Sequence, residues 1–493
     1  MERQFVTSEN QEHLFAGFDS AENKCLKKLE YYTIYVLFCH VFSQKNSMRI
    51  IIAGAGEVGT HLAKMLSNEN HEILLIDPEE DRLRPIDSSL DVLTYHGSAT
   101  SVDLLQNILK KKTDLFIAVT HSEDTNITTS ILAKKFGALK TIARIDNLEY
   151  LEHSTEEFFK SLGIDSLIYP ELIAAREVLG LIHETGTTEF MEFSGGTLAM
   201  YVMKLDEKAP ILNKTLEEIA LSSKTDKYRA VAIKRMDKTI IPRGGEIFRL
   251  GDLVYVISTR EGIEEMMKTS GKENFEAKSI MILGGSRIGK HVALYMQKSS
   301  EVKLIDSNLE RCEELAEILE HTLVINGDCR NVDLLTQEGL TKMDAFVAVT
   351  GNSETNILSC LLAKKMGVKR TIAEVENMEY INLAENTGID TIINKKISAA
   401  SRIFRHTTNP NVTQVKYLTG ADAEILEFNV PANSRITKGT LRSMDFPDDA
   451  IVGGGTRDGI PFIATGDTII KANDKVVIFT LPTAYEKISK FFN

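Results

Sequence analysis

The chain has 493 residues, of which 43% are hydrophobic and 26% are charged, and its formal net charge is −13. This composition is that of a globular protein with several domains, because a single hydrophobic core stops growing at about 250–300 residues. The acidic balance argues against non-specific nucleic-acid binding, which requires a basic surface that displaces counterions.

Residues 1–47 are expected to be an extension outside the core fold, because Met48 directly precedes the first predicted strand. Within this extension, residues 31–42 (YYTIYVLFCHVF) are apolar, but about 20 apolar residues are needed to cross a membrane. A membrane-contacting arm is the alternative role for this stretch. The five cysteines form no paired motif and no histidine cluster has metal-ligand spacing, so we expect a reduced, cytosolic setting and no metal site.

A strand–turn–helix pattern begins at residue 49, where the apolar run RIIIA is followed by a glycine-rich turn and by apolar residues at helical spacing. Further short apolar runs predict five more strands, at 72–76, 91–95, 115–119, 141–145 and 166–168. The stretches between them are long enough for helices. Six strands that alternate with helices predict an α/β fold with a doubly wound, Rossmann-like parallel sheet.

The same landmarks recur in the second half of the chain. Gly54 and Gly284 are separated by 230 residues (284 − 54), and the same offset relates Gly97 to Gly327 and Asn126 to Asn356. The run DLFIAVT at 114–120 likewise matches DAFVAVT at 344–350. Several landmarks at one offset indicate a duplicated unit.

Each predicted sheet is followed by a helix candidate and then by short alternating runs, which predict a small α+β lobe. The predicted units are therefore an extension at 1–47, a first Rossmann-like lobe at 48–188, its small lobe at 189–273, a second Rossmann-like lobe at 274–423, and its small lobe at 424–493.

The first glycine-rich turn predicts a nucleotide site, which comprises Gly54, Ala55, Gly56, Glu57, Val58 and Gly59. The first glycine permits the tight turn, the second lets the main chain approach a pyrophosphate, and the third lets the helix pack against the strand. Asp77 ends the second strand, where a carboxylate accepts hydrogen bonds from ribose hydroxyls and disfavours a 2′-phosphate. We therefore expect NAD(H) or ATP/ADP here rather than NADP.

Three further groups of residues are expected to line the same crevice. Gly97, Ser98 and Ala99 follow the third strand and should flank the adenine, whereas Thr120, His121 and Asn126 follow the fourth strand. Arg144 ends the fifth strand, where a cation would add charge-assisted hydrogen bonds to phosphates. The alternatives are ordinary helix capping near Ser122 and a surface arginine without a ligand.

The second glycine-rich turn departs from the pattern. Gly284, Gly289 and the ribose-position Asp306 are retained, but Ser286 replaces the middle glycine, and its Cβ would crowd a pyrophosphate. Glu374 stands at the position equivalent to Arg144, which is a charge reversal that would repel phosphate. We expect this second site to be weak or empty.

The order of these motifs over residues 48–493 resembles the TrkA family of tandem regulator-of-potassium-conductance (RCK, also called KTN) proteins. The resemblance implies a cytosolic, peripheral regulatory subunit on the inner face of the membrane. It implies that NAD(H) or an adenine nucleotide binds the first sheet and gates the membrane pore subunit of a Trk-type potassium transporter. It also implies a homo-oligomeric ring, and we expect a tetramer.

Two helix candidates, at 171–183 and 396–405, carry apolar faces that are broader than one small lobe would cover. In the family that the chain resembles, helices at this place join sheets to lobes and to neighbouring subunits. Burial within the same chain is the alternative.

An enzyme is the rival interpretation, because a dehydrogenase also uses a Rossmann-like sheet. It would need a general acid or base at the nicotinamide and a substrate domain. The stretch 189–271 contains no histidine, and the next large unit is another sheet. We therefore expect no catalytic residues and a regulator. A nucleotide sensor for another membrane transporter is the remaining alternative.

Overall fold

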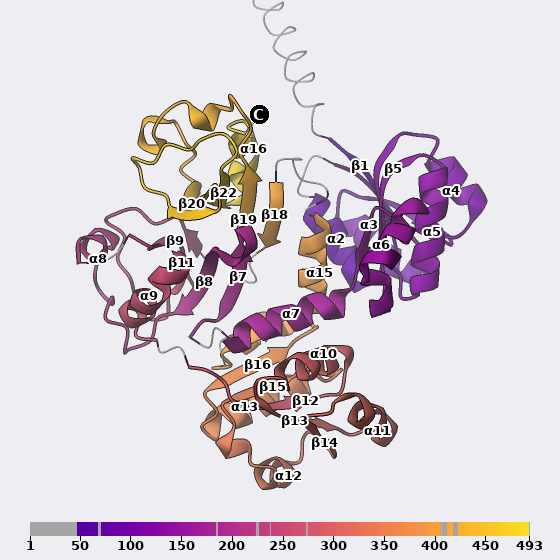
Figure 1. Cartoon of the computed structure of the whole chain (residues 1–493). Helices are drawn as coiled ribbons and strands as arrows, with labels where there is room; N and C mark the ends of the chain where they lie inside the picture. The colour runs from indigo at the N-terminus through magenta and orange to yellow at the C-terminus, as the bar shows by residue number, and fades with distance from the viewer. Residues whose placement is uncertain are drawn as a thin grey trace, which may run out of the picture.

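The computed structural model describes residues 47–67, 71–183, 186–222, 226–236, 238–272, 275–385, 387–404, 406, 412–417 and 423–492. The apolar stretch at 31–42, and all but the last residue of the extension predicted at 1–47, lie outside these residues. The described part of the chain contains two parallel sheets and two antiparallel sheets, together with the helices that pack on them (Figure 1). In these residues no helix combines the length and the apolar character that a membrane crossing requires.

The first parallel sheet has the strand order β3-β2-β1-β4-β5-β6. Its core strand is apolar on both faces, and Ile50, Ile51 and Ile52 are fully buried because helices cover both sides. The elements are β1 (Arg49–Ala53), α2 (Glu57–Ser67), β2 (Glu72–Asp77), α3 (Glu80–Ser89), β3 (Leu93–His96), α4 (Val102–Ile108), β4 (Thr113–Ala118), α5 (Glu123–Lys135), β5 (Ala138–Arg144), α6 (His153–Ser161) and β6 (Ser166–Ile168). The predicted doubly wound sheet is confirmed.

A long helix and a five-stranded antiparallel sheet follow, with the order β10-β9-β11-β8-β7. Both faces of this sheet are buried, because successive residues of its strands belong to two separate hydrophobic clusters. The elements are α7 (Pro170–His183), β7 (Glu189–Phe193), β8 (Leu198–Lys204), α8 (Leu216–Ser222), β9 (Tyr228–Arg235), β10 (Lys238–Ile240), β11 (Leu253–Thr259) and α9 (Ile263–Ser270).

The second parallel sheet repeats the first, with the order β14-β13-β12-β15-β16-β17. The elements are β12 (Ser279–Leu283), α10 (Arg287–Met296), β13 (Glu301–Asp306), α11 (Leu309–Ile318), β14 (Thr322–Asn326), α12 (Val332–Gln337), β15 (Ala345–Ala348), α13 (Ser353–Lys365), β16 (Arg370–Glu374), α14 (Met378–Glu385), β17 (Thr391–Ile393) and α15 (Lys395–Phe404). The predicted duplication is therefore present in the fold as well as in the sequence.

The second antiparallel sheet has the order β18-β19-β22-β20-β21. The elements are β18 (Val412–Tyr417), β19 (Glu424–Asn429), β20 (Ala450–Arg457), β21 (Ile460–Ile463), β22 (Lys475–Thr480) and α16 (Tyr485–Ser489). Because β18 pairs with β19, this sheet begins earlier than the predicted boundary at residue 424.

The helices α7 and α15 are exchanged between the two halves. The buried face of α7, including Val178 and Leu181, packs with Val292 of α10 in the second half. The buried face of α15, including Ile403, packs with Leu62 of α2 in the first half (Figure 1). The broad apolar faces of both helices are thus buried within the same chain, which was the alternative to contact with another subunit.

The two antiparallel sheets also pack on each other. Phe193 and Tyr255 of the first share a core with Ile425 and Phe479 of the second, and the Tyr255 and Phe479 ring centroids are 5.7 Å apart. The helix exchange and this shared core both join the four bodies.

Candidate nucleotide site

The first glycine loop, at residues 54–59, joins β1 to α2, and two of its glycines are required by the backbone. Gly54 has φ of +111°, which side chains of L-residues rarely adopt. A Cβ on Gly59 would lie 1.8 Å from the carbonyl oxygen of Gly54. These two positions make the tight turn and the close helix–strand packing that the sequence predicts.

Gly56 differs, because nothing in the described chain requires a glycine there. Its φ lies outside the left-handed range, and a Cβ would meet a single neighbouring atom within 4 Å, Nε2 of His121 at 3.9 Å. The space above Gly56 is therefore open, at the N-terminus of α2. Backbone amides and the helix dipole make such a position favourable for phosphate.

Asp77 fixes the shape of this loop. It is 3% exposed, and its carboxylate oxygens accept the amide of Ala55 (2.7 Å) and the amide of Glu79 (2.9 Å). The guanidinium of Arg82 lies 4.0 Å from the same carboxylate and is also paired with Glu79. Asp77 thus holds the end of β2 and the glycine loop together, at the edge where a ribose would bind.

The turn after β3 lies beside Asp77. The amide of Gly97 donates to the carbonyl oxygen of Asp77 (3.0 Å), and Ser98 is exposed and bonded to Thr100 (2.9 Å). Ala99 is 5% exposed and packs in the hydrophobic core on that side of the sheet. Gly97 and Ser98 are therefore at the predicted edge, whereas the methyl group of Ala99 points into the core.

Asn126 is fully occupied by contacts inside the protein. Its Oδ1 accepts the amide (2.8 Å) and the hydroxyl (2.7 Å) of Thr120, and its Nδ2 donates to the carbonyl oxygens of Thr120 (3.1 Å) and Arg144 (3.0 Å). Its side chain ties the ends of β4 and β5 together. Ser122 caps α5 by accepting the amide of Thr125 (3.1 Å), so the capping alternative describes this turn. His121 remains exposed beside Gly56.

Arg144 is largely buried among acidic groups. Its guanidinium lies 3.3 Å from Asp146 and 3.8 Å from Glu171, at the start of α7, while its Nε has no hydrogen-bond partner among the residues that the structure describes. With its side chain 17% exposed, Arg144 is not on the open surface, and its role toward a ligand stays a prediction. The sequence did not single out Glu171 as a site residue.

The second glycine loop, at residues 284–289, has the same backbone geometry, but the side chain of Ser286 fills the space that is open at Gly56. Gly284 has φ of +102°, and a Cβ on Gly289 would lie 2.1 Å from the carbonyl oxygen of Gly284. Asp306 accepts the amide of Gly285 (2.7 Å), as Asp77 does with Ala55. The hydroxyl of Ser286 accepts the amide of Gly289 (3.3 Å), so a side chain fills the start of α10.

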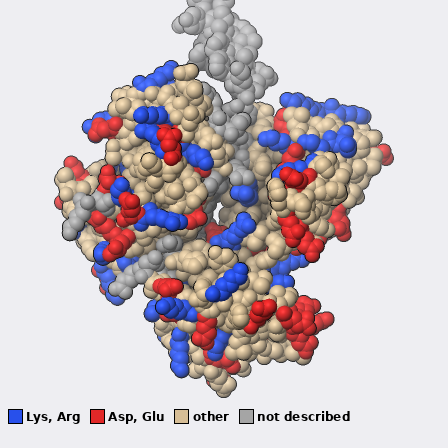
Figure 2. Space-filling view, viewed as in Figure 1, with Lys and Arg blue, Asp and Glu red and all other residues tan. Residues whose placement is uncertain are grey.

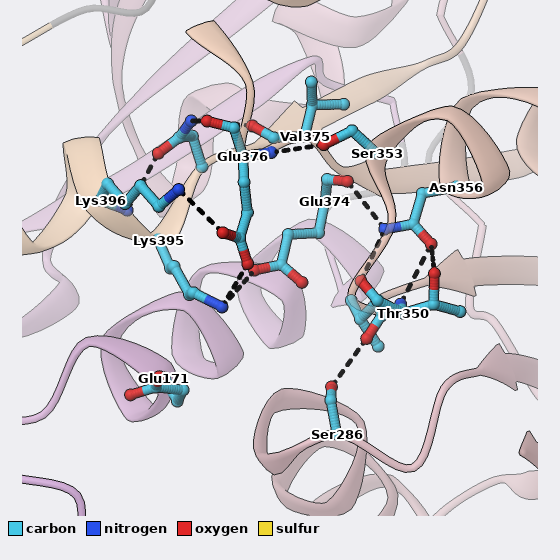
Figure 3. Close-up of polar contacts among 12 residues, drawn as sticks. Glu171, Ser286, Thr350, Ser353, Asn356, Glu374, Val375, Glu376, Lys395 and Lys396 are labelled. Carbon is cyan, nitrogen blue, oxygen red and sulfur yellow. Dashed lines mark hydrogen bonds and ion pairs between the residues drawn. The ribbon is translucent and has the colours of Figure 1, made fainter. Parts of the chain in front are cut away.

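Glu374 is buried beside lysines of α15 (Figure 3). Its Oε1 lies 3.4 Å from Nζ of Lys395, which is also 2.5 Å from Glu376. Burial raises the pKa of Glu374 to about 7, against the opposing effect of Lys395. The negative charge predicted from the sequence is thus reduced by burial and offset by Lys395, which sequence reasoning missed.

A separate cavity of about 1400 Å³ lies between the two antiparallel lobes, lined by apolar residues such as Met203, Val254 and Phe446. None of its lining residues belongs to either glycine loop.

On the face in Figure 2, acidic and basic side chains are interspersed over the lobes.

These features define a class of protein: two mononucleotide-binding folds in one chain, each followed by a small antiparallel lobe. The TrkA-N domain model matches residues 50–170 and 280–395, and the TrkA-C domain model matches residues 200–271 and 425–493. The chain belongs to the TrkA family.

The chain is similar to named relatives over most of its length. It is 32% identical over 454 residues to the Trk system potassium uptake protein TrkA homolog 1 of Methanosarcina mazei, covering 90% of this chain and 100% of the relative. It is 29% identical over 438 residues to the Trk system potassium uptake protein TrkA of Halomonas elongata, covering 88% and 96%.

Two solved structures share the fold. The crystal structure of the GsuK RCK domain has a TM-score of 0.57 at 16% identity and covers 91% of this chain and 96% of its own. The GsuK channel bound to NAD has a TM-score of 0.57 at 15% identity and covers 99% and 89%.

Proposed function

We propose that this chain is the cytosolic regulatory subunit of a Trk-type potassium uptake system, and that NAD(H) or ATP/ADP bound at the first glycine loop controls the membrane pore. The observation that carries the nucleotide assignment is the open space at Gly56, a glycine that the protein's own packing does not require. The names of its relatives, Trk system potassium uptake proteins, support the transport assignment.

The second loop is proposed to be weak or empty. Ser286 already supplies the hydrogen bond that a phosphate would offer to the start of α10, and its Cβ stands where a pyrophosphate would approach. Glu374 stands where the first sheet has Arg144, so this arginine is missing at the same edge of the second sheet.

Regulation requires no bond to be made or broken. A nucleotide that prefers one arrangement of the lobes shifts their population by its difference in affinity for the two arrangements. The exchanged helices α7 and α15 connect the nucleotide edge of each sheet to the other half, so a movement at the first loop would reach the second lobe. We propose that a symmetric oligomer, a tetramer at the inner face of the membrane, transmits this movement to the pore.

Potassium flux through proteoliposomes that contain the candidate pore tests this function. We expect flux to change on addition of NAD⁺, NADH, ADP or ATP when the unmodified chain is present. Gly56→Ser should remove the response while the chain still co-sediments with the vesicles. Flux that ignores every one of these nucleotides would refute the proposal and favour a sensor for another transporter.

A further inference from the structure

Three matched positions at the interface between the two Rossmann-like lobes carry opposite charges, whereas the matched residues Asp146 and Glu376 are both acidic. The 230-residue offset pairs Glu57 with Arg287 and Arg144 with Glu374. The second half is five residues shorter before its last helix, so the offset there is 225, as the alanine pairs at 174–175 and 399–400 show. This offset matches Glu171 with Lys396. All three pairs are charge reversals.

Each glycine loop sends its charged residue to the other half. Arg287 of the second loop lies 3.3 Å from Asp146, which follows β5 of the first sheet. Glu57 of the first loop forms an ion pair with Lys396 of α15, and Lys396 is also 2.8 Å from Glu376 (Figure 3). The helix exchange brings these groups together, because it places α15 on α2 and α7 on α10.

The direct ion-pair partners of the two loop residues are opposite in sign. Arg287 meets a first half whose nearby groups include Asp146 and Glu171. Glu57 meets a second half that presents Lys396, with Lys395 beside it holding Glu374 and Glu376. The change from arginine to glutamate at position 374 therefore gives Lys395 of α15 an ion-pair partner, in addition to its proposed effect on the second nucleotide site.

Pairing of two first lobes would bring equal charges together. If two first lobes met through this face, Glu57 would approach Asp146 and Glu171 of the other copy, which are both acidic. If two second lobes met, Arg287 would approach Lys396 but also Glu376, which matches Asp146 at the 230-residue offset, so the repulsion applies to two first lobes. Like charges placed opposite each other at an interface suppress the wrong partner.

We propose that these reversed charges specify mixed pairing: a first lobe pairs with a second lobe and rejects another first lobe. The face of the first lobe that carries Glu57, Asp146 and Glu171 therefore always pairs with a second lobe, in the same chain or in another copy. The chain avoids misassembly in an oligomer that contains several nearly identical sheets. The individual ion pairs are partly exposed, so the discrimination comes from the sum of several charges.

Charge exchange in the full chain tests the proposal, with carbodiimide cross-linking and thermal unfolding as readouts. In the unmodified chain a zero-length cross-link should join Glu57 to Lys396. Glu57→Lys and Lys396→Glu should each lower the unfolding midpoint and reduce lobe pairing by about fivefold, the ratio expected for one partly exposed ion pair. The double variant should restore both the midpoint and a cross-link between positions 57 and 396.

Mixing of isotope-labelled and unlabelled chains tests rejection directly. In Glu57→Lys alone, position 57 should become cross-linked to Asp146 or Glu171 of a second copy, and the double variant should lose this product. Glu264→Lys is the matched control, because it reverses an exposed glutamate that pairs with Lys268 within one helix, at 2.6 Å. The proposal is overturned if the double variant is no better than either single variant, or if the new cross-link fails to form.

Discussion

The hydroxyl of Ser286 donates a hydrogen bond to the carbonyl oxygen of Val349 at 2.7 Å, which ties the second glycine loop to the end of β15. The first loop has Gly56 at the matching position and leaves the same space open. The side chain of Ser286 is thus a difference in shape between two loops whose backbones are alike. This difference underlies the asymmetry that we propose between the two nucleotide sites.

Gly56→Ser should leave the fold intact. A Cβ at this position has space, and the hydroxyl could cap α2 as Ser286 caps α10, so we expect stability to be unchanged or raised by up to about 1 kcal/mol. Gly59→Ala is the contrasting variant, because its Cβ would lie 1.8 Å from a carbonyl oxygen. It should cost about 3 kcal/mol or more. Urea denaturation of both variants checks this, and equal destabilisation would contradict the distinction.

Asp77→Ala should affect both the ligand and the protein. We expect nucleotide affinity to fall by about 1.5–3 kcal/mol, the contribution of a charged hydrogen bond. Stability should fall as well, because the amides of Ala55 and Glu79 lose their acceptor. Titration with NAD⁺ and NADP⁺ separates the effects, and tighter binding of NADP⁺ by the unmodified chain would show that Asp77 does not select the ribose.

Asn126→Ala and Asn356→Ala should destabilise the chain to a similar extent. Each asparagine makes the same four hydrogen bonds, which join the ends of two neighbouring strands. Each unpartnered buried group costs about 1–3 kcal/mol. Thermal unfolding measures the loss. A much larger effect of Asn126→Ala on nucleotide binding than on stability would instead indicate a direct contact with ligand.

Stability should fall between about pH 4.5 and pH 7 because of Glu374. Burial raises the pKa of its carboxyl from 4.5 to about 7 in the folded chain. The folded state then holds a proton that the unfolded state has lost, so the stabilisation is complete below pH 4.5 and is lost as the pH passes 7. The loss is on the order of 3 kcal/mol. Glu374→Gln should remove this part of the pH dependence, whereas Glu376→Gln, on the same segment, should retain it.

The sequence predicts the sheets well because their signals are local. The apolar run at 49–53, the glycine spacing at 54–59 and Asp77 at a strand end each lie within one strand–turn–helix unit. The contact between Glu57 and Lys396 could not be predicted in this way. This contact depends on which half of the chain each exchanged helix packs against. The apolar periodicity of a helix predicts that one of its faces is buried, but it does not predict which element covers that face.

Two other features required the structure for a similar reason. Asn126 follows a strand end at the edge that the sequence predicts to bind a ligand, and only its four internal hydrogen bonds show that its side chain is already occupied. The first strand of the last sheet, VTQVKY at 412–417, is short and has polar residues inside it. Its apolar signal is too weak to move the predicted boundary before residue 424.

Isothermal titration of the purified full chain with NAD⁺, NADH, ADP and ATP tests the central claim most directly. We predict one strong adenine-nucleotide site per chain, which Gly56→Ser abolishes and Ser286→Gly leaves in place. Two equal sites in the unmodified chain, or binding that survives Gly56→Ser unchanged, would contradict the assignment of the first loop as the nucleotide site.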